Sequence, residues 1–227
     1  MGIVLGIDVG GTFTDFLEIG GNDGARIVKV PSTPAAPADG VMSGLAQLAG
    51  GVARLPAYLS GVELIVHGTT ITTNAIITRR YARTGYVTTK GFRDILNSRR
   101  GLKRSAFTAK EAPPEPIVPQ YLVRIVDERL DKSGAVIQPL REDDVREAAA
   151  HFRREGIEAV AVCTMFSFLN PAHEQRIKAL LQEALPGVYV TASHEVLPQL
   201  RFYERGSTTV FNACAGPLLR GYMDGLL

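Results

Sequence analysis

The stretch IDVGGTFTDFLEIGG, residues Ile7–Gly21, is the most informative part of this sequence. An apolar run ends in Asp8, two adjacent glycines follow, and two threonines then flank a phenylalanine before a second acid, Asp15. Residues 12–19 are rich in β-branched and aromatic residues and end in a turn, which predicts a strand over 13–19 rather than a helix. Gly10 and Gly11 are therefore expected in a turn between two strands.

The turn does not fit two familiar phosphate loops. A Walker loop requires a GxxxxGK[ST] pattern before a helix, and the expected lysine is absent here. A dinucleotide fingerprint requires GxGxxG opening a helix, whereas here the glycines are adjacent and a strand follows. One interpretation is that the glycines only satisfy the geometry of a hairpin turn.

We favour phosphate binding, because glycines let the backbone approach a ligand closely and allow positive φ. Successive N–H groups then point into one concavity and form an anion-binding nest. Thr12 and Thr14 add hydroxyl donors. Asp8 suits a Mg²⁺ held through water, and Asp15 is expected to face the same metal or the attacking group.

The rest of the chain predicts mixed α/β architecture. A third strand over 26–30 and a helix over 40–48 complete a βββα start, and strands then alternate with helices. We expect strands over 63–68, 85–89, 158–166 and 188–193, and helices over 70–80, 91–96, 141–156, 170–186 and 201–227. Thr70 is a candidate helix cap, and the last helix is expected to break or end near Gly216-Pro217. Residues 121–130 and 135–139 flank DKSG and predict a hairpin.

Composition limits the class of protein. The 227 residues suit one large domain or two small ones, and 45% hydrophobic residues are enough for a packed core. We expect a cytoplasmic protein that enters no membrane, because no signal-peptide pattern precedes the first strand and no apolar stretch could cross a bilayer. Two isolated cysteines and four scattered histidines have no zinc-ligand spacing, so buried thiols are expected and a structural metal is not.

A basic segment covers residues 79–110, which hold ten Lys/Arg and the single acid Asp94. It predicts a solvated face, an interface, or a patch for phosphate or carboxylate, with Arg93, Arg99 and Arg100 as candidates. No nucleic-acid-binding module accompanies it, so a nucleic-acid partner is not expected.

Two further clusters are candidate substrate sites. His67, Thr69, Thr70 and Asn74 gather where a strand is expected to enter a helix, whose free N–H groups and dipole favour an anion or carbonyl oxygen. The other interpretation is a helix cap beside a buried histidine. Ser193-His194-Glu195 follows a strand; adjacent residues rarely form a triad, so loop and cap roles compete with a substrate role for His194.

Five separated motifs, in matching order and spacing, resemble the hydantoinase A / 5-oxoprolinase family. They are DVGGTFTD, HGTTITTNAIITRR (67–80), TGYVTTKGFRDIL (84–96), SFLNPAHEQR (167–176) and SHEVLPQLRFYERGSTTVFNA (193–213). The resemblance implies an α/β fold, a ribonuclease H-like or actin-like ATPase lobe with a βββα start, a mixed sheet flanked by helices and an inserted hairpin. It also implies that residues 1–200 are the family's N-terminal domain and that 201–227 are the first, truncated helix of the next domain.

The resemblance further implies an enzyme that uses ATP and Mg²⁺ to phosphorylate a cyclic amide oxygen before ring opening. Asp8, Gly10, Gly11, Thr12 and Thr14 then resemble the phosphate and Mg²⁺ site, and Asp15 its closing acid. In the wider superfamily a second hairpin and an adenosine loop come from another lobe. The chain alone is therefore expected to be inactive and to need its C-terminal domains or a partner subunit.

Three alternatives stay open. The same lobe fits a subunit of an ATP-dependent acetone or acetophenone carboxylase. A non-catalytic module that docks a partner through its basic segment would keep the fold without using ATP. A sugar kinase is the third, although the chain lacks the cysteine-rich zinc motif frequent in that group.

Overall fold

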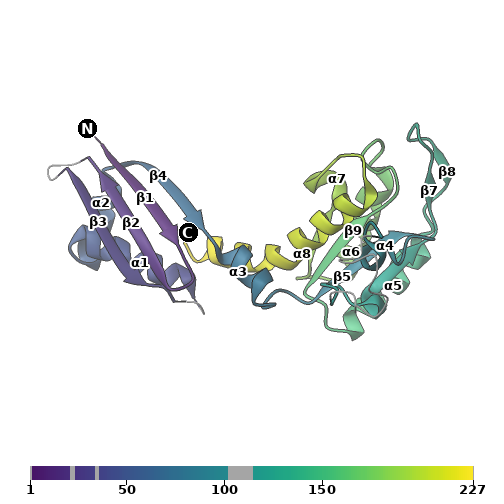
Figure 1. Cartoon of the computed structure of the whole chain (residues 1–227), viewed down its shortest axis with the longest axis horizontal. Coiled ribbons are helices and arrows are strands. Elements are labelled where there is room, and N and C mark those ends of the chain that lie inside the picture. The colour runs from purple at the N-terminus through teal and green to yellow at the C-terminus, as the bar shows by residue number, and fades with distance from the viewer. Residues whose placement is uncertain (1, 21–23, 34–35, 102–114, 227) are drawn as a thin grey trace, which may run out of the picture. The chain divides into compact units, whose positions relative to one another are not determined.

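The computed structural model describes residues 2–20, 24–33, 36–101 and 115–226, and the chain divides into two compact units (Figure 1). Unit 1 comprises Met1–Arg80 with Leu218–Leu227, and unit 2 comprises Tyr81–Pro217. Each unit has its own four-stranded sheet. The two units are defined by contacts within this chain and are not the predicted domains. The predicted domain boundary near residue 200 therefore stays a prediction.

Unit 1 contains the predicted βββα start. Its strands are β1 (Ile3–Val9), β2 (Phe13–Ile19), β3 (Ala25–Pro31) and β4 (Val62–Thr69), in the order β3-β2-β1-β4. The first three pair antiparallel and β4 pairs parallel to β1, so this sheet is mixed as predicted. β1 and β4 therefore end at the same edge of the sheet.

Two α-helices and one 3-10 helix of unit 1 pack on one face of this sheet. They are α1 (Pro37–Ala49), the 3-10 helix η1 (Val52–Arg54) and α2 (Leu55–Leu59); the last two were not predicted. Leu5, Val9 and Phe16 point into this core and are at most 1% exposed. Gly44 lets α1 approach closely, since a Cβ there would lie 2.1 Å from Phe16 Cε2. Residues that alternate with these along β1 and β2 must lie on the other face.

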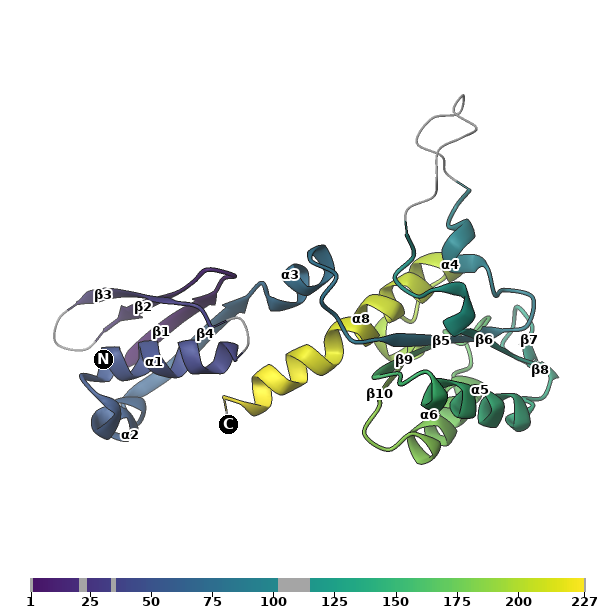
Figure 2. The same cartoon turned by 90° about the horizontal axis from the view of Figure 1, so that it is seen from below.

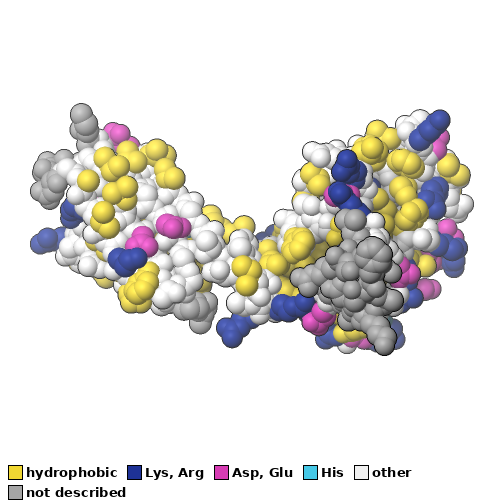
Figure 3. Space-filling model, viewed as in Figure 1, with side chains coloured by type: hydrophobic (Ala, Val, Ile, Leu, Met, Phe, Trp, Pro, Cys, Tyr) yellow, Lys and Arg dark blue, Asp and Glu magenta, His cyan; other side chains and the backbone are white. Residues whose placement is uncertain are grey.

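That second face, which we call the open face, carries exposed hydrophobic side chains. Leu17, Ile19, Ile27, Leu64 and Val66 are 41–77% exposed, and the strand registers place them on the same side. Figure 3 shows hydrophobic side chains on the surface over this sheet. Towards the turn between β1 and β2 the open face becomes polar, which places the acidic residues of that turn at an accessible edge.

Unit 2 is built on a parallel sheet. Its strands are β5 (Thr84–Thr89), β6 (Val123–Val126), β9 (Ala159–Cys163) and β10 (Tyr189–Ala192), in the order β10-β9-β5-β6. Every residue of β5 and β9 is buried, because helices cover both faces (Figure 2). Gly85 faces Phe152 of one helix, whereas the next residue, Tyr86, faces Gly206 of another.

The helices of unit 2 mostly follow the predicted pattern. They are α4 (Ile95–Ser98), the 3-10 helix η2 (Gln120–Leu122), α5 (Glu142–Arg154), α6 (Ala172–Ala184), α7 (Ser193–Val196) and α8 (Phe202–Asp224), which continues into unit 1. Pro217 lies inside α8, so the break expected near Gly216-Pro217 is wrong. Both cysteines are free and buried, as predicted.

The predicted hairpin is present but shorter. Its strands are β7 (Arg129–Leu130) and β8 (Val136–Gln138), around the DKSG turn. The expected first arm began at Tyr121, but Val123–Val126 pair with β5 in the parallel sheet instead. Strand pairing therefore divides the segment 121–130 between the parallel sheet and the hairpin.

Candidate functional site

The turn from Gly10 to Phe13 offers free backbone amides. Gly10 N donates to Phe13 O over 3.0 Å and closes the turn. The N–H groups of Gly11 and Thr12 make no hydrogen bond within the described residues, and both residues are exposed. Two successive donors are therefore available to an anion, whereas the amide of Gly10 is committed to the turn.

Gly10 and Gly11 are needed because neighbouring atoms leave no room for a side chain, not because the backbone has positive φ. A Cβ on Gly10 would lie 2.9 Å from Phe13 O, and one on Gly11 would lie 3.0 Å from Asn74 Nδ2. Neither has positive φ, although other glycines of the chain do. The expectation of positive φ at this turn is wrong, whereas the close approach of a ligand to these glycines stays a prediction.

Asp8 and Asp15 are direct cross-strand neighbours on the open face. Asp15 Oδ1 forms an ion pair with Lys29 Nζ on β3 at 2.7 Å, whereas Asp8 is exposed and has no ion pair within the described residues. On its other side Asp8 meets Gly68, where a Cβ would lie 3.4 Å from Asp8 Oδ1. The carboxylate of Asp8 is therefore the one left open to a cation beside the turn.

Thr14 braces the turn from the opposite face. It is fully buried, and its Oγ1 lies 3.0 Å from Ser32 Oγ, which donates to Gly10 O over 2.8 Å. Thr12, in contrast, is exposed in the turn. Of the two threonines, only Thr12 therefore lies where a phosphate would be accessible, and Ser32 is a supporting residue that sequence patterns did not indicate.

The polar cluster after β4 lies partly beside the turn. Thr70 N donates to Val9 O over 3.1 Å, and Asn74 Nδ2 donates to Thr70 Oγ1 over 3.1 Å close to Gly11. The helix α3 (Ile71–Ile77) is shorter than predicted. Thr70 is its N-cap residue, as predicted, but the Thr70 side chain makes no capping hydrogen bond, and Thr69 Oγ1 accepts a hydrogen bond from Ile71 N instead. The structure brings Thr69, Thr70 and Asn74 to the turn.

His67 lies apart from this group. It pairs with Ile7 across the sheet, so its ring points to the side opposite Asp8. There it stacks on Tyr222 of α8, whose hydroxyl oxygen lies 2.6 Å from His67 Nε2. Burial lowers the pKa of His67, and the charge of Asp8 opposes this only in part. His67 is thus a neutral, packed histidine.

His194 belongs to unit 2, where its partner is distant in sequence. Its Nδ1 lies 2.8 Å from Oε2 of Glu174, a fully buried carboxylate on α6. Near it on α8, Arg205 is 1% exposed and donates to Ser193 Oγ and Thr164 O. The hydrogen-bond partners of His194 and Arg205 lie on other elements, so the spacing of residues along the chain could not indicate them.

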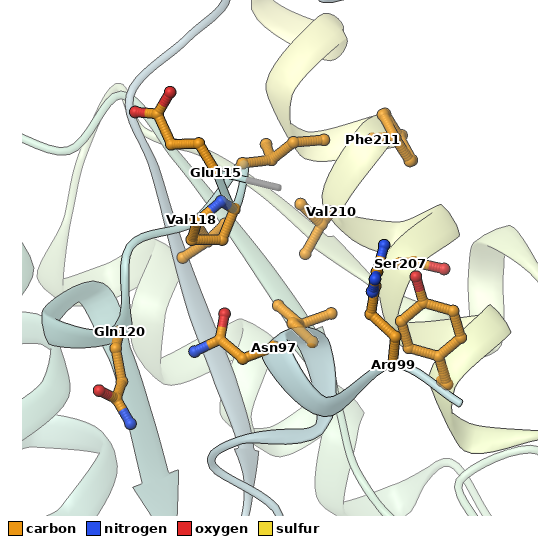
Figure 4. A pocket seen from close by; sticks show the side chains of 12 residues that line it. Asn97, Arg99, Glu115, Val118, Gln120, Ser207, Val210 and Phe211 are labelled. Atoms are coloured by element: carbon orange, nitrogen blue, oxygen red, sulfur yellow. The ribbon is translucent and has the colours of Figure 1, made fainter. Parts of the chain in front are cut away.

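The basic segment is partly neutralised. Residues 102–110 lie outside the described part of the chain, but Arg83, Lys90 and Arg100 form ion pairs with Glu155, Asp127 and Glu204. Near this segment unit 2 has a pocket of about 420 Å³, between α4, residues 115–120 and α8. Figure 4 shows Asn97, Gln120 and Ser207 around it, with Val118, Val210 and Phe211 providing apolar walls. Its volume suits a small molecule.

These features define an α/β protein with an open, acid-flanked hairpin turn. A family model described as the hydantoinase/oxoprolinase N-terminal region matches residues 4–185, and the chain belongs to this family. The caprolactamase subunit alpha of Pseudomonas jessenii is 38% identical over 223 residues, which cover 97% of this chain and 32% of that protein. The chain thus spans about a third of the length of this relative.

Solved structures agree with the family assignment. A nucleotide-free acetone carboxylase structure, from work on ATP-dependent acetone carboxylation, superposes with a TM-score of 0.87 and 26% identity over 99% of this chain and 34% of that chain. The ATP-dependent caprolactamase from Pseudomonas jessenii superposes with a TM-score of 0.85 and 38% identity over 97% and 32%. The predicted fold class, an actin-like ATPase lobe, is confirmed. No helix in the described part of the chain is long and apolar enough to span a membrane.

Proposed function

We propose that this chain is the N-terminal part of an ATP-dependent cyclic-amide hydrolase whose phosphate site is the turn between β1 and β2. The γ-phosphoryl group of ATP passes to the amide oxygen, which yields ADP and an O-phosphorylated imidate. One water then attacks the former carbonyl carbon and the ring opens at the C–N bond, which leaves a free amine and an acyl phosphate. A second water hydrolyses the acyl phosphate to the carboxylate and inorganic phosphate. The chain completes its site with its own further domains or with a partner subunit.

One observation carries the proposal. Asp8, without an ion-pair partner in the described residues, lies at the same exposed edge as the free amides of Gly11 and Thr12. Amides hold phosphate oxygens, and an exposed carboxylate suits Mg²⁺ that retains its waters. Bound Mg²⁺ would neutralise charge on the phosphates. Asp15, held by Lys29, completes the acidic edge.

The other candidates are assigned by their placement. Thr12 adds a hydroxyl to the phosphate site, and Thr14 keeps the turn in shape through Ser32. Asn74, Thr70 and Thr69 line the side of the turn formed by α3 and contact a bound phosphate or amide oxygen from there. His67 supports the end of β4 through Tyr222 rather than reaching the substrate.

Calorimetric titration with ATP tests the proposal. We expect heat of binding that requires Mg²⁺, and Asp8→Asn is expected to remove this requirement together with most of the binding. Asp39→Asn, which changes an acid in the first turn of α1, is the matched control and should bind like the unchanged protein. An absence of nucleotide binding with and without Mg²⁺, or equal binding by both variants, would contradict the proposal.

A ketone carboxylase subunit is the second candidate. The superposition on acetone carboxylase favours it as much as the superposition on caprolactamase favours the amide hydrolase. The two functions differ in the substrate that stimulates ATP hydrolysis by the complete enzyme. Stimulation by lactams or hydantoins supports the amide hydrolase, whereas stimulation by acetone or acetophenone with bicarbonate supports the carboxylase.

A further inference from the structure

The pocket of unit 2 has walls from three parts of the chain, namely α4, residues 115–120 and α8. The α8 wall consists of Tyr203, Ser207, Val210 and Phe211, which lie at positions i, i+4, i+7 and i+8 and therefore share one side of the helix. Val210 is 3% exposed, whereas Phe211 is 42% exposed although its side chain is apolar. The cavity of about 420 Å³ thus leaves apolar surface uncovered that a small molecule can cover.

Contacts within the protein hold the opposite wall in place. Gln120 Nε2 donates to Asp94 Oδ1 over 2.5 Å, and Arg93 donates to Gln120 O over 3.3 Å, so the start of η2 is tied to the start of α4. Just before α4, the ring of Phe92 packs edge to face on Phe202 at the start of α8, with 5.1 Å between the ring centroids. The walls are therefore held together without a ligand.

The composition of the walls favours a neutral ligand with an apolar body. The two charged lining residues, Arg99 and Glu115, have opposite signs, so the lining has no net charge. A charged ligand would leave water without a net opposite charge to compensate it. Half of the lining side chains are apolar: Leu96, Pro116, Ile117, Val118, Val210 and Phe211.

Asn97 supplies hydrogen-bonding groups that the protein itself does not use. Its side chain lines the pocket, between Gln120 and Ser207 in Figure 4, and makes no hydrogen bond within the described residues. Ser207 Oγ, in contrast, already donates to Glu204 O over 3.1 Å. A carboxamide presents one acceptor and one NH₂ donor side by side, whichever way the group is turned. Asn97 can therefore make two hydrogen bonds to one ligand.

A ligand that uses both groups must itself present an N–H and an acceptor on the same side. An amide inside a small ring does so, because ring closure forces its cis form. An open-chain amide is trans, its N–H and C=O point in opposite directions, and the cis form costs free energy. The carboxamide of Asn97 therefore discriminates between cyclic and open-chain amides.

We propose that this pocket binds a neutral cyclic amide. Asn97 donates to the amide oxygen and accepts from the amide N–H, while Val118, Val210 and Phe211 contact the carbons of the ring. The choice of a cyclic amide among ligands with such a donor and acceptor pair rests on the proposed function, whereas the walls and the two hydrogen-bonding groups do not. The pocket lies in unit 2 and includes no residue of the phosphate turn.

Titrations of the whole 227-residue chain without nucleotide, followed by ¹H–¹⁵N NMR, test this proposal. The probes are 2-piperidinone, N-methyl-2-piperidinone, which lacks the N–H, and N-ethylpropanamide, an open-chain amide with as many carbons as 2-piperidinone. We expect the side-chain NH₂ signals of Asn97, assigned by their loss in Asn97→Ala, to move with 2-piperidinone. The other two probes lose one hydrogen bond and should bind about tenfold more weakly.

A matched pair of variants separates the role of Asn97 from a general effect on the protein. Asn97 is exposed, so Asn97→Ala should keep the fold, and it should weaken binding of 2-piperidinone at least about tenfold, measured through the main-chain signals of α4. Gln138→Ala removes an exposed carboxamide from β8 in the same unit and should bind like the unchanged chain. Phe211→Ala should weaken binding of all three probes and keep their order.

Three results would overturn the proposal: Asn97 signals that do not move with 2-piperidinone, equal binding of the three probes, or equal binding of 2-piperidinone by Asn97→Ala and Gln138→Ala. The outcome is separate from that of the phosphate site. Calorimetry with ATP reports on the turn at Asp8, so either proposal can fail while the other holds.

Discussion

The polar residues at the strand ends differ between the two sheets in their exposure and in their hydrogen bonding. In unit 1 the carboxylate of Asp8 and the amides of Gly11 and Thr12 are exposed and lack partners within the described residues. In unit 2 Glu174 and Arg205 are fully enclosed and bonded to surrounding hydroxyls and backbone. A site for a large, charged ligand must stay open, whereas a buried charge must be satisfied by the protein itself.

The largest effect is expected where the charge is enclosed. Arg205→Ala removes the donors to Thr164 O and to Ser193 Oγ, which itself donates to the buried Glu174. We expect a loss of about 3–5 kcal/mol in the free energy of unfolding, measured by urea denaturation. Arg100→Ala removes an exposed ion pair with Glu204 and should cost about 0.2–1 kcal/mol. Equal losses would contradict the contrast between enclosed and exposed charges.

A pH titration of stability sharpens the same comparison. The pKa of Glu174 lies below its ordinary value of 4.5, so folding favours the ionised form. The stabilisation is fully present above pH 4.5 and is lost as the pH falls through the lowered pKa. The melting temperature should therefore fall below pH 4.5, and Glu174→Gln should flatten this fall. An unchanged slope in Glu174→Gln would show that other acids control it.

The smallest effect has the opposite sign. Asp8 and Asp15 are like charges directly opposite each other, and such pairs destabilise a sheet. Asp8→Asn is expected to raise the free energy of unfolding by about 0.2–1 kcal/mol without ligand, while it weakens binding of ATP with Mg²⁺. If Asp8→Asn gains stability and loses ATP binding, Asp8 is present for ligand binding and not for the stability of the fold. A loss of stability would indicate that Asp8 has a structural role instead.

Local patterns predicted much of unit 1. The β-branched and aromatic residues of Phe13–Ile19 indicated a strand, so the glycine pair was correctly placed in a hairpin turn rather than before a helix. The side of the sheet on which each residue lies was harder to predict. Thr12 and Thr14 are two positions apart and were treated alike, yet one is exposed in the turn and the other fully buried. Pairing register and the position of α1 decide that difference.

Unit 2 shows where sequence patterns were insufficient. His194 was singled out beside Ser193 and Glu195, but the carboxylate that holds its Nδ1 is Glu174, twenty positions earlier on another helix. Arg205 is buried with partners from two other segments, Thr164 after β9 and Ser193 after β10, because α8 packs that side against the sheet. Pro217 was expected to end a helix that in fact continues past it.

The sequence by itself determined the family, the βββα start with most of the later strands and helices, and the acid-flanked glycine turn, since these depend on residues close together in the chain. Only the tertiary structure decided which groups of that turn are free, which sheet Val123–Val126 joins, and which carboxylate holds His194. Hydrogen bonding and burial act over a few ångströms in space, and residues separated by tens of positions become neighbours only when the sheets form.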